Sequence, residues 1–316
     1  MARADGAADG RSLDIRLLGP ISAERHGEPV SLGGPRQRAV LARLALVPGQ
    51  VVTVDRLIDD VWAGDPPATA INTLQSYVSL LRRALGDPQL LRREGPGYTL
   101  SVARDVLDAM RFEDEVANAR ASLATDPDRT LRHLAHALDE WRGPVLADVA
   151  DEDWARPAAV RWEELRLEAL ETRFDALLAL GRHGEAVPEL ERAVDEHRLR
   201  EGFAQRLMLA LYRCGRQAEA LRVYSRTREV LAEELGLDPT PTLVQLQTRI
   251  LNHDPDLAAP ASAWTPPVDA QAPVVVTTEP APTGFVPSPV PLPGPATRAA
   301  TGPFVGRDDQ LARLHQ

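Results

Sequence analysis

The residues best suited to a specific chemistry lie between Ala68 and Leu85, in a stretch that contains no acidic residue. Side-chain amides can bond adenine and arginine can bond guanine or phosphate, so a helix face that carries them suits a nucleic acid. An ordinary solvated helix usually carries carboxylates, whereas a surface that faces phosphates excludes them. The candidate contact residues are Asn72, Thr73, Gln75, Ser76, Ser79, Arg82 and Arg83.

The apolar residues of this stretch are spaced as in an amphipathic helix. At 100° per residue, the stripe within about 40° of Leu74 is purely aliphatic, and hydroxyls, an amide and an arginine fall about 140–200° away. Gln75 and Arg82 lie on one shoulder of the polar face, and Thr73 and Leu80 lie on the other. The pattern therefore predicts a helix with one buried face and one face free to bind.

The ends of this helix also have sequence signals. Asp65 is expected to cap it, Pro66 to occupy its first turn, and Gly86 to end it. Half or more of the contacts in protein–DNA interfaces go to the sugar–phosphate backbone. The side chains for which base contacts and backbone contacts remain alternatives are Asn72, Gln75 and Ser76.

The elements before this helix are short. Strand-like runs at residues 14–20, 21–27 and 28–32 are separated by Gly and Pro. A helix is expected to begin at Pro35, and a second, shorter one to be capped by Thr53.

A β-hairpin is expected to follow the candidate helix, around the turn at residues 95–97. It carries Arg92 and Arg93, which could bind phosphate or the minor groove, where the negative potential favours arginine. The alternative is a solvated pair beside Glu94. Strands, three helices and a closing hairpin describe a winged helix, and we expect residues 12–103 to suffice for specific DNA contact.

From Val106 to Asn252 the pattern is helical throughout. A GxxxEA motif that opens a helix at Gly181 recurs at Gly215, a period of 34 residues that is typical of tetratricopeptide repeats. The chain is thus predicted to be mainly α, with an N-terminal α/β winged helix-turn-helix followed by an all-α, tetratricopeptide-like domain.

Two blocks of the sequence carry a family resemblance. Residues 62–86 and the closing GPGYTL at 95–100 resemble the OmpR-type winged helix, in the wording of the Streptomyces antibiotic regulatory protein (SARP) family. Residues 141–171 resemble the bacterial transcriptional activation domain that follows it in that family. The two resemblances together cover about residues 12–253 in the family's order.

The resemblance implies a transcription activator and its partners. Two copies would bind promoter direct repeats near the −35 element as a dimer on double-stranded DNA. The helical domain would support dimerisation and hold RNA polymerase through its sigma factor and its alpha C-terminal domains. The targets would be secondary-metabolite (antibiotic) biosynthesis genes.

The resemblance also assigns roles to single residues. Tyr98 joins the wing contacts, and the turn of Ala63, Gly64 and Asp65 touches polymerase, with a plain turn as the alternative. Leu80 and Thr99 stand where relatives often have arginine, so each is expected to remove a phosphate contact.

Charge and composition narrow the class of protein. The net charge is −10, but residues 1–103 contain 12 Arg against 11 acidic residues, so the acidity belongs to the rest. No Lys is present, which excludes a GxxxxGK[ST] phosphate loop within this sequence. We expect a cytoplasmic, nucleoid-associated protein that is not an enzyme and needs no membrane, cofactor or metal. His133 and His136 are interpreted as surface histidines and the single cysteine, Cys214, as a packed helix residue.

Five segments are predicted along the chain. They are a disordered N-terminus (1–11), the winged-helix domain (12–103), the helical activation domain (104–253), a linker (254–302) and the start of a truncated nucleotide-binding domain (303–316). Residues 254–303 hold 13 of the 27 prolines, which favours an extended linker. Two other functions are weighed: a tetratricopeptide-type interaction scaffold, and the regulatory N-terminal part of a STAND signalling ATPase. The acid-free helix face argues against the first, and the missing Lys argues against ATP chemistry in this stretch.

Overall fold

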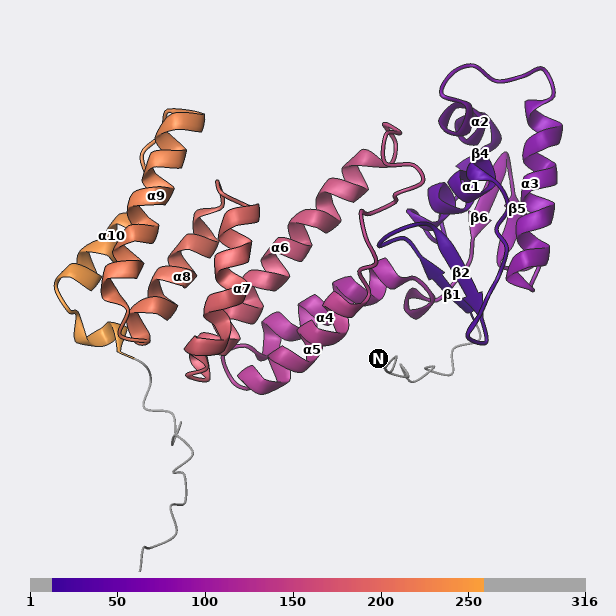
Figure 1. The fold of residues 1–316 in the computed structure, drawn as a ribbon. Helices are drawn as coiled ribbons and strands as arrows, with labels where there is room; N and C mark the ends of the chain where they lie inside the picture. The colour runs from indigo at the N-terminus through magenta and orange to yellow at the C-terminus, as the bar shows by residue number, and fades with distance from the viewer. Residues whose placement is uncertain (1–12, 259–316) are drawn as a thin grey trace, which may run out of the picture. The chain divides into compact units, whose positions relative to one another are not determined.

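The computed structural model describes residues 13–258 and has the predicted fold class, a winged helix followed by an all-helical region (Figure 1). The expected N-terminal segment (1–11), most of the expected linker and the expected start of a nucleotide-binding domain (303–316) lie outside the described residues. Among the helices that are described, none is both long and apolar enough to cross a membrane.

The first sheet is antiparallel, in the order β1 (Leu13–Arg16), β2 (Ser22–Arg25) and β3 (Glu28–Pro29). Alternate residues of β1 point into the core, because successive side chains of a strand face opposite sides. Leu13 and Ile15 are therefore buried.

Three helices follow, α1 (Pro35–Ala45), α2 (Val54–Trp62) and α3 (Ala70–Leu85). The predicted cap of α2 is confirmed, since the Thr53 hydroxyl accepts a 3.2 Å hydrogen bond from the Arg56 amide. The predicted end of α3 is confirmed as well, because Gly86 adopts the left-handed conformation that favours glycine.

The predicted start of α3 is wrong. Its N-cap is Thr69, and Asp65 and Pro66 lie in the connection before it. A residue that precedes proline is disfavoured in helical geometry, and the Pro66–Pro67 pair applies that restriction to both Asp65 and Pro66.

The second sheet has the order β4 (Val52–Thr53), β6 (Gly97–Leu100) and β5 (Leu91–Glu94). The β5–β6 hairpin is the predicted wing. The two-residue strand β4 was not predicted, and it anchors the hairpin to the start of α2. A Cβ at Gly97 would collide with the Val52 backbone, so this close strand approach requires glycine.

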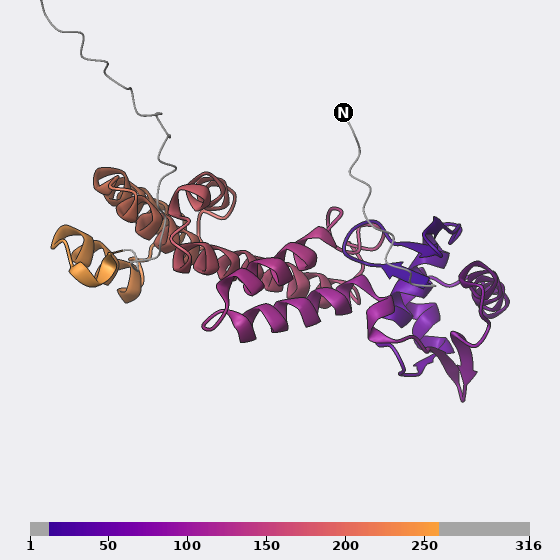
Figure 2. The same cartoon turned by 90° about the horizontal axis from the view of Figure 1, so that it is seen from below.

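The helical domain consists of consecutive helices that pack side by side in pairs (Figure 2). Gly181 and Gly215, which open the repeated motif, both turn the chain with positive φ between successive helices. Cys214 is exposed at the end of α8, so the expectation of a packed cysteine is wrong. The elements are η1 (Arg104–Val106), α4 (Asp108–Ser122), α5 (Pro127–Asp139), α6 (Arg156–Ala179), α7 (His183–Glu196), α8 (Glu201–Arg213), α9 (Gln217–Leu235), α10 (Pro241–Leu251) and η2 (Pro255–Leu257).

The first residues of the expected linker continue the helical domain. Leu257, in η2, is buried in the second hydrophobic cluster, and its carbonyl oxygen accepts a 3.0 Å hydrogen bond from Arg213. Ordered structure therefore extends several residues beyond the expected boundary at 253.

A buried carboxylate connects the winged helix to the helical domain. Asp108, at the start of α4, is fully buried and accepts hydrogen bonds from the amides of Leu17 (2.7 Å) and Leu18 (2.9 Å), just after β1. The Arg142 guanidinium lies 3.0 Å away. Burial raises the pKa of Asp108, against the lowering effect of the two amides and Arg142. One continuous hydrophobic cluster runs from Leu13 to residues of α6.

The segment before α6 makes further contacts with the winged helix. The carboxylate of Asp148 accepts a hydrogen bond from the Ile21 amide (2.6 Å) and another from the Arg38 guanidinium (2.8 Å). The Trp154 indole donates a 3.0 Å bond to the carbonyl oxygen of Asp60, in α2. A winged helix cut off at residue 103 would lose these partners and expose core surface, so residues 12–103 are not an independent module in this structure.

Candidate nucleic-acid interface

The outer face of α3 is polar and open. Leu74, Val78, Leu81 and Leu85 are buried against the core, as the periodicity predicts. Of the candidate contact residues of α3, Thr73 and Arg82 are partly buried. The fully exposed candidates are Asn72, Gln75, Ser76, Ser79 and Arg83.

The hydroxyl groups on this face are engaged in part. The Ser76 hydroxyl donates to the Asn72 carbonyl oxygen at 3.0 Å, and the Thr73 hydroxyl donates to the Thr69 carbonyl oxygen at 3.0 Å. Each oxygen can still accept a bond from outside. No hydrogen bond within residues 13–258 involves the side-chain amides of Asn72 or Gln75, which leaves their donors and acceptors free.

Arg82 has a structural partner in the wing. Its Nε donates a 2.7 Å hydrogen bond to the carbonyl oxygen of Leu91, the first residue of β5. This contact holds α3 and the hairpin side by side (Figure 1). The sequence pattern indicates Arg82 as a contact residue but gives no sign of this supporting role.

The wing presents its two arginines on the outside. Arg92 is exposed and donates a 3.2 Å bond to the Ser101 hydroxyl, and the Arg93 guanidinium lies 5.9 Å from the centre of the Tyr98 ring. Tyr98 itself is only 4% exposed, so its main contact is with the protein. Thr99 is also buried, and its position therefore does not favour the phosphate contact expected of an arginine there.

The arginines of the winged-helix domain fall into two groups. Four are paired with carboxylates: Arg16, Arg38, Arg43 and Arg56. Six have no ion pair within the described part of the chain: Arg25, Arg36, Arg82, Arg83, Arg92 and Arg93. All six lie on or against α3 or the wing, so the uncompensated positive charge of a nearly neutral domain gathers around one face.

Two of the unpaired arginines lie outside α3 and the wing and were not predicted from the sequence. The Arg25 guanidinium lies against Gly86 at the end of α3, where a Cβ would collide with it. The Arg36 guanidinium lies 5.6 Å from the Trp62 ring centre, and Trp62 stacks on Tyr77 of α3. No motif marks either residue, because the contacts join elements distant in sequence.

The turn between α2 and α3 is exposed. Ala63 and Gly64 both have positive φ, and the Asp65 amide donates a 3.0 Å bond to the Trp62 carbonyl oxygen. This geometry fits a plain turn and leaves the side chain of Asp65 available to a partner. The polymerase contact stays a prediction.

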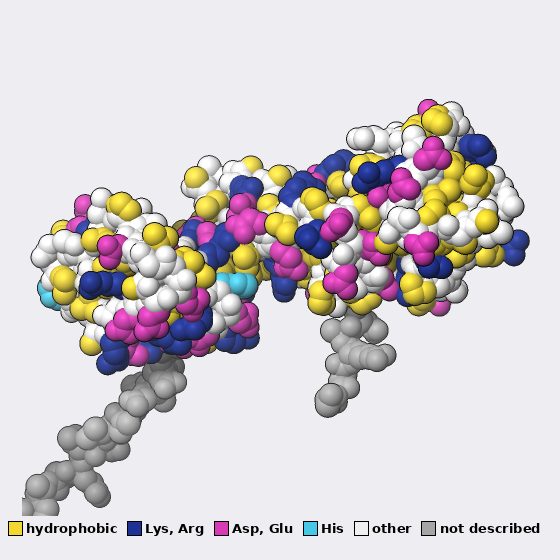
Figure 3. Space-filling model, turned by 90° about the horizontal axis from the view of Figure 1, so that it is seen from above, with side chains coloured by type: hydrophobic (Ala, Val, Ile, Leu, Met, Phe, Trp, Pro, Cys, Tyr) yellow, Lys and Arg dark blue, Asp and Glu magenta, His cyan; other side chains and the backbone are white. Residues whose placement is uncertain are grey.

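The charges of the helical domain mostly neutralise one another. Arg200 lies 2.6 Å from Glu171, and Arg206 lies 2.6 Å from Asp175. Basic and acidic side chains interleave over much of the face drawn in Figure 3. Within the ranges that the structure describes, no group of three or more His, Cys, Asp or Glu residues has the geometry to hold a metal ion.

Two family matches cover most of these elements. Residues 27–100 match the C-terminal domain of transcriptional regulatory proteins, and residues 107–251 match the bacterial transcriptional activator domain. The solved structure of Mycobacterium tuberculosis EmbR in complex with a low affinity phosphopeptide is similar, with a TM-score of 0.74 and 41% identity. The similarity covers 77% of this chain and 65% of that one.

The similar curated proteins are regulators. Regulatory protein AfsR of Streptomyces coelicolor is 46% identical over 254 residues, which are 80% of this chain and 25% of AfsR, so the chain spans about a quarter of that protein's length. Regulatory protein DnrI of Streptomyces peucetius is 35% identical over 256 residues, 78% of this chain and 94% of DnrI. The chain therefore belongs to the SARP family of transcriptional regulators, with an OmpR-type winged helix and a bacterial transcriptional activator domain.

Proposed function

We propose that this regulator binds specific double-stranded DNA through α3 and the β5–β6 wing. The observation that carries the proposal is the position of the six unpaired arginines around an α3 face without acidic residues. A face that neutralises phosphates gains from the release of counterions, and paired arginines elsewhere in the domain do not contribute to it. An α-helix with free amides is also the element that reads base edges in the major groove.

The free groups suggest a division of roles. Asn72 and Gln75, whose amides have no partner in the described chain, are the best candidates for reading bases. Arg83, Arg92 and Arg93 supply phosphate or minor-groove contacts. For Thr73, Ser76 and Ser79 the proposal is acceptance or donation of bonds to the DNA backbone. Arg82 and Tyr98 support the wing by their contacts with Leu91 and Arg93.

We further propose that the helical domain holds RNA polymerase, through the sigma factor and the alpha C-terminal domains. Support comes from its match to the bacterial transcriptional activator domain and from its acidic balance, which does not favour contact with phosphates. Two copies would occupy direct repeats near the −35 element, and the genes controlled would be those of secondary-metabolite biosynthesis. The name of AfsR gives only regulation, so target genes and partners are part of this proposal.

The test compares DNA binding with transcription for the same full chain. A short operator is first selected from a random duplex pool, and binding is then measured against salt. A specific, salt-dependent shift is expected, whereas a tetratricopeptide-type scaffold would give none. Purified transcription from a promoter with two copies of that operator should rise above basal level.

The Asp65→Ala variant separates the two activities. Asp65 is exposed, and its side chain makes no hydrogen bond within residues 13–258, so the fold should be unaffected. If the turn contacts polymerase, D65A will keep the footprint and lose transcript yield. An unchanged yield would restrict the polymerase contact to the helical domain.

A further inference from the structure

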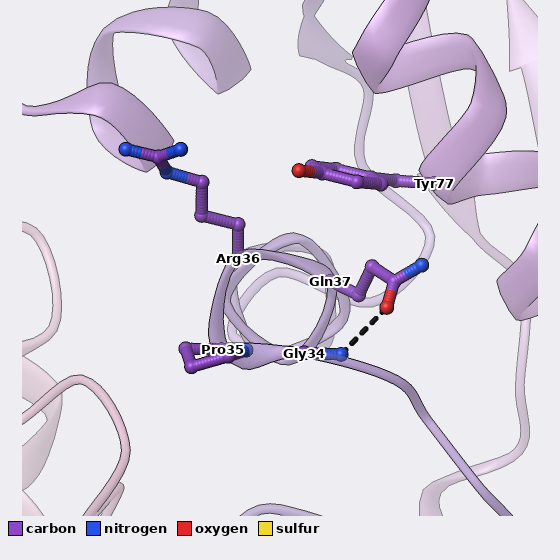
Figure 4. A pocket seen from close by; sticks show the side chains of 5 residues that line it. All are labelled: Gly34, Pro35, Arg36, Gln37 and Tyr77. Carbon is purple, nitrogen blue, oxygen red and sulfur yellow. Dashed lines mark hydrogen bonds between the residues drawn. The ribbon is translucent and has the colours of Figure 1, made fainter.

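The N-terminus of α1 opens into a pocket of about 370 Å³, lined by Gly34, Pro35, Arg36, Gln37 and Tyr77 (Figure 4). The Gln37 side chain accepts a 2.6 Å bond from the Gly34 amide and thereby fixes the start of the helix. The first turn of α1 contains no acidic residue. The pocket therefore joins a helix N-terminus, an arginine and one side of α3.

Arg36 is held in place by aromatic rings. Its guanidinium lies over the Trp62 ring at 5.6 Å, and the Trp62 and Tyr77 rings are stacked, with centres 6.1 Å apart and planes 7° from parallel. A guanidinium stacks well on such a surface and keeps its hydrogen-bond donors at the edge. Arg36 is exposed and has no carboxylate partner in the described part of the chain, so these donors are free.

The position of Arg36 relative to α3 defines what it can reach. Tyr77 lies on the shoulder of α3 that also carries Thr73 and the exposed Leu80, whereas Arg82, which contacts the wing, lies on the opposite shoulder. Arg36 and the wing arginines thus flank the polar face of α3 from its two sides. A helix seated in the major groove has a phosphate backbone along each side.

We propose that Arg36 binds a DNA phosphate on the backbone that borders α3 opposite the wing. The planar guanidinium fits a phosphate in bidentate fashion, and the positive end of α1 adds to the local potential. A base contact is not favoured, because Arg36 stands beside the polar face and not on it. This inference rests on the proposed DNA binding and extends it to α1, which neither the resemblance nor the α3 pattern indicates.

The experiment measures the slope of log affinity against log salt for the full chain on the selected operator duplex. Arg36→Ala should reduce the magnitude of the slope by about 1 and weaken selected and random duplexes by the same factor. Arg36→Lys retains a point charge and should restore most of the slope. Arg132→Ala is the matched control, since Arg132 is exposed on α5 without an ion pair and far from α3 in sequence; it should leave the slope unchanged.

A second measurement locates the phosphate. Duplexes with single neutral methylphosphonates should include one position, on the side of α3 away from the wing, that weakens the wild-type chain and not R36A. Thermal unfolding of each variant shows that it is folded. An R36A slope equal to that of the wild type, with Arg92→Ala flattened in the same assay, overturns the inference. If the wild-type chain binds no duplex, the proposed function itself is wrong.

Discussion

Arg82 and Leu91 join the recognition face to the wing: the guanidinium Nε, on α3, donates a 2.7 Å hydrogen bond to the carbonyl oxygen at the start of β5. The two surfaces proposed to enter the major and minor grooves are thus fixed to each other before DNA is bound. Preorganised surfaces lose less conformational entropy on binding, so this bond supports affinity even without touching DNA.

Arg82→Ala should test that support. Arg82 is partly buried, and loss of its bond to Leu91 is expected to lower the free energy of unfolding by about 1 kcal/mol, near the lower end for a hydrogen bond from a charged group. DNA affinity should fall for all sequences alike, because the wing is no longer held. Urea unfolding and DNA titration give the two quantities. Reduced affinity and salt slope with unchanged stability would instead make Arg82 a phosphate contact.

Gln75→Ala tests base reading. The amide of Gln75 is exposed and has no partner in the described chain, so its loss should cost about 1–3 kcal/mol on the selected operator and relax the preference at one base pair. Gln245→Ala, an exposed amide on α10, is the control and should change neither quantity. The measurement is repeated operator selection with each variant. An unchanged preference and affinity for Q75A would remove its assigned role.

The sequence allowed the architecture to be predicted because the signals are local. The Thr53 cap, the Gly86 end of α3 and the spacing around Leu74 each depend on a few neighbouring residues. The start of α3 was misjudged because Asp65 satisfies a capping pattern that the two following prolines override. Arg36 could not be predicted as a candidate, since its exposure and aromatic contacts arise only when α1, α2 and α3 pack together.

Arg92→Ala tests the wing. Arg92 is exposed, and its single described bond goes to the Ser101 hydroxyl, so the fold should tolerate its loss. We expect weaker binding to every sequence and a salt slope smaller by about 1. A change in preferred sequence with an unaltered slope would contradict the backbone or minor-groove role.

Asp108→Ala should separate the winged helix from the helical domain. The substitution leaves the amides of Leu17 and Leu18 and the Arg142 guanidinium without their buried acceptor, at an expected cost of about 3–5 kcal/mol in the free energy of unfolding. Asp108→Asn keeps the shape and one acceptor oxygen, so it should cost less. Urea unfolding measures both. Equal and small losses would show that apolar packing alone holds this junction.

His183 should make the helical domain sensitive to acid. Both ring nitrogens are buried without a hydrogen-bond partner, and burial together with the positive charge of Arg213 lowers the pKa of His183. The unfolded chain therefore takes up this proton first, and stability falls as the pH drops below about 6.5, until the folded state is protonated too.

His183→Leu is expected to remove this loss and to add about 1 kcal/mol at neutral pH, because no polar atom is then buried unpaired. His136→Leu, on the exposed side of α5, should change the stability at neutral pH by less than about 0.5 kcal/mol. Urea unfolding at several pH values provides the comparison. An H183L chain that keeps the wild-type difference between neutral and acidic pH would assign the effect to other groups.

The six unpaired arginines around α3 and the wing have a regulatory consequence. A guanidinium stays charged until the pH exceeds about 12, and lysine acetylation, which elsewhere neutralises DNA-binding surfaces, has no target side chain in a sequence without Lys. The charge of this face is therefore constant under cellular conditions. Any signal that loosens the regulator from its operator has to act through shape, by shifting the hairpin or by changing how two copies sit beside each other.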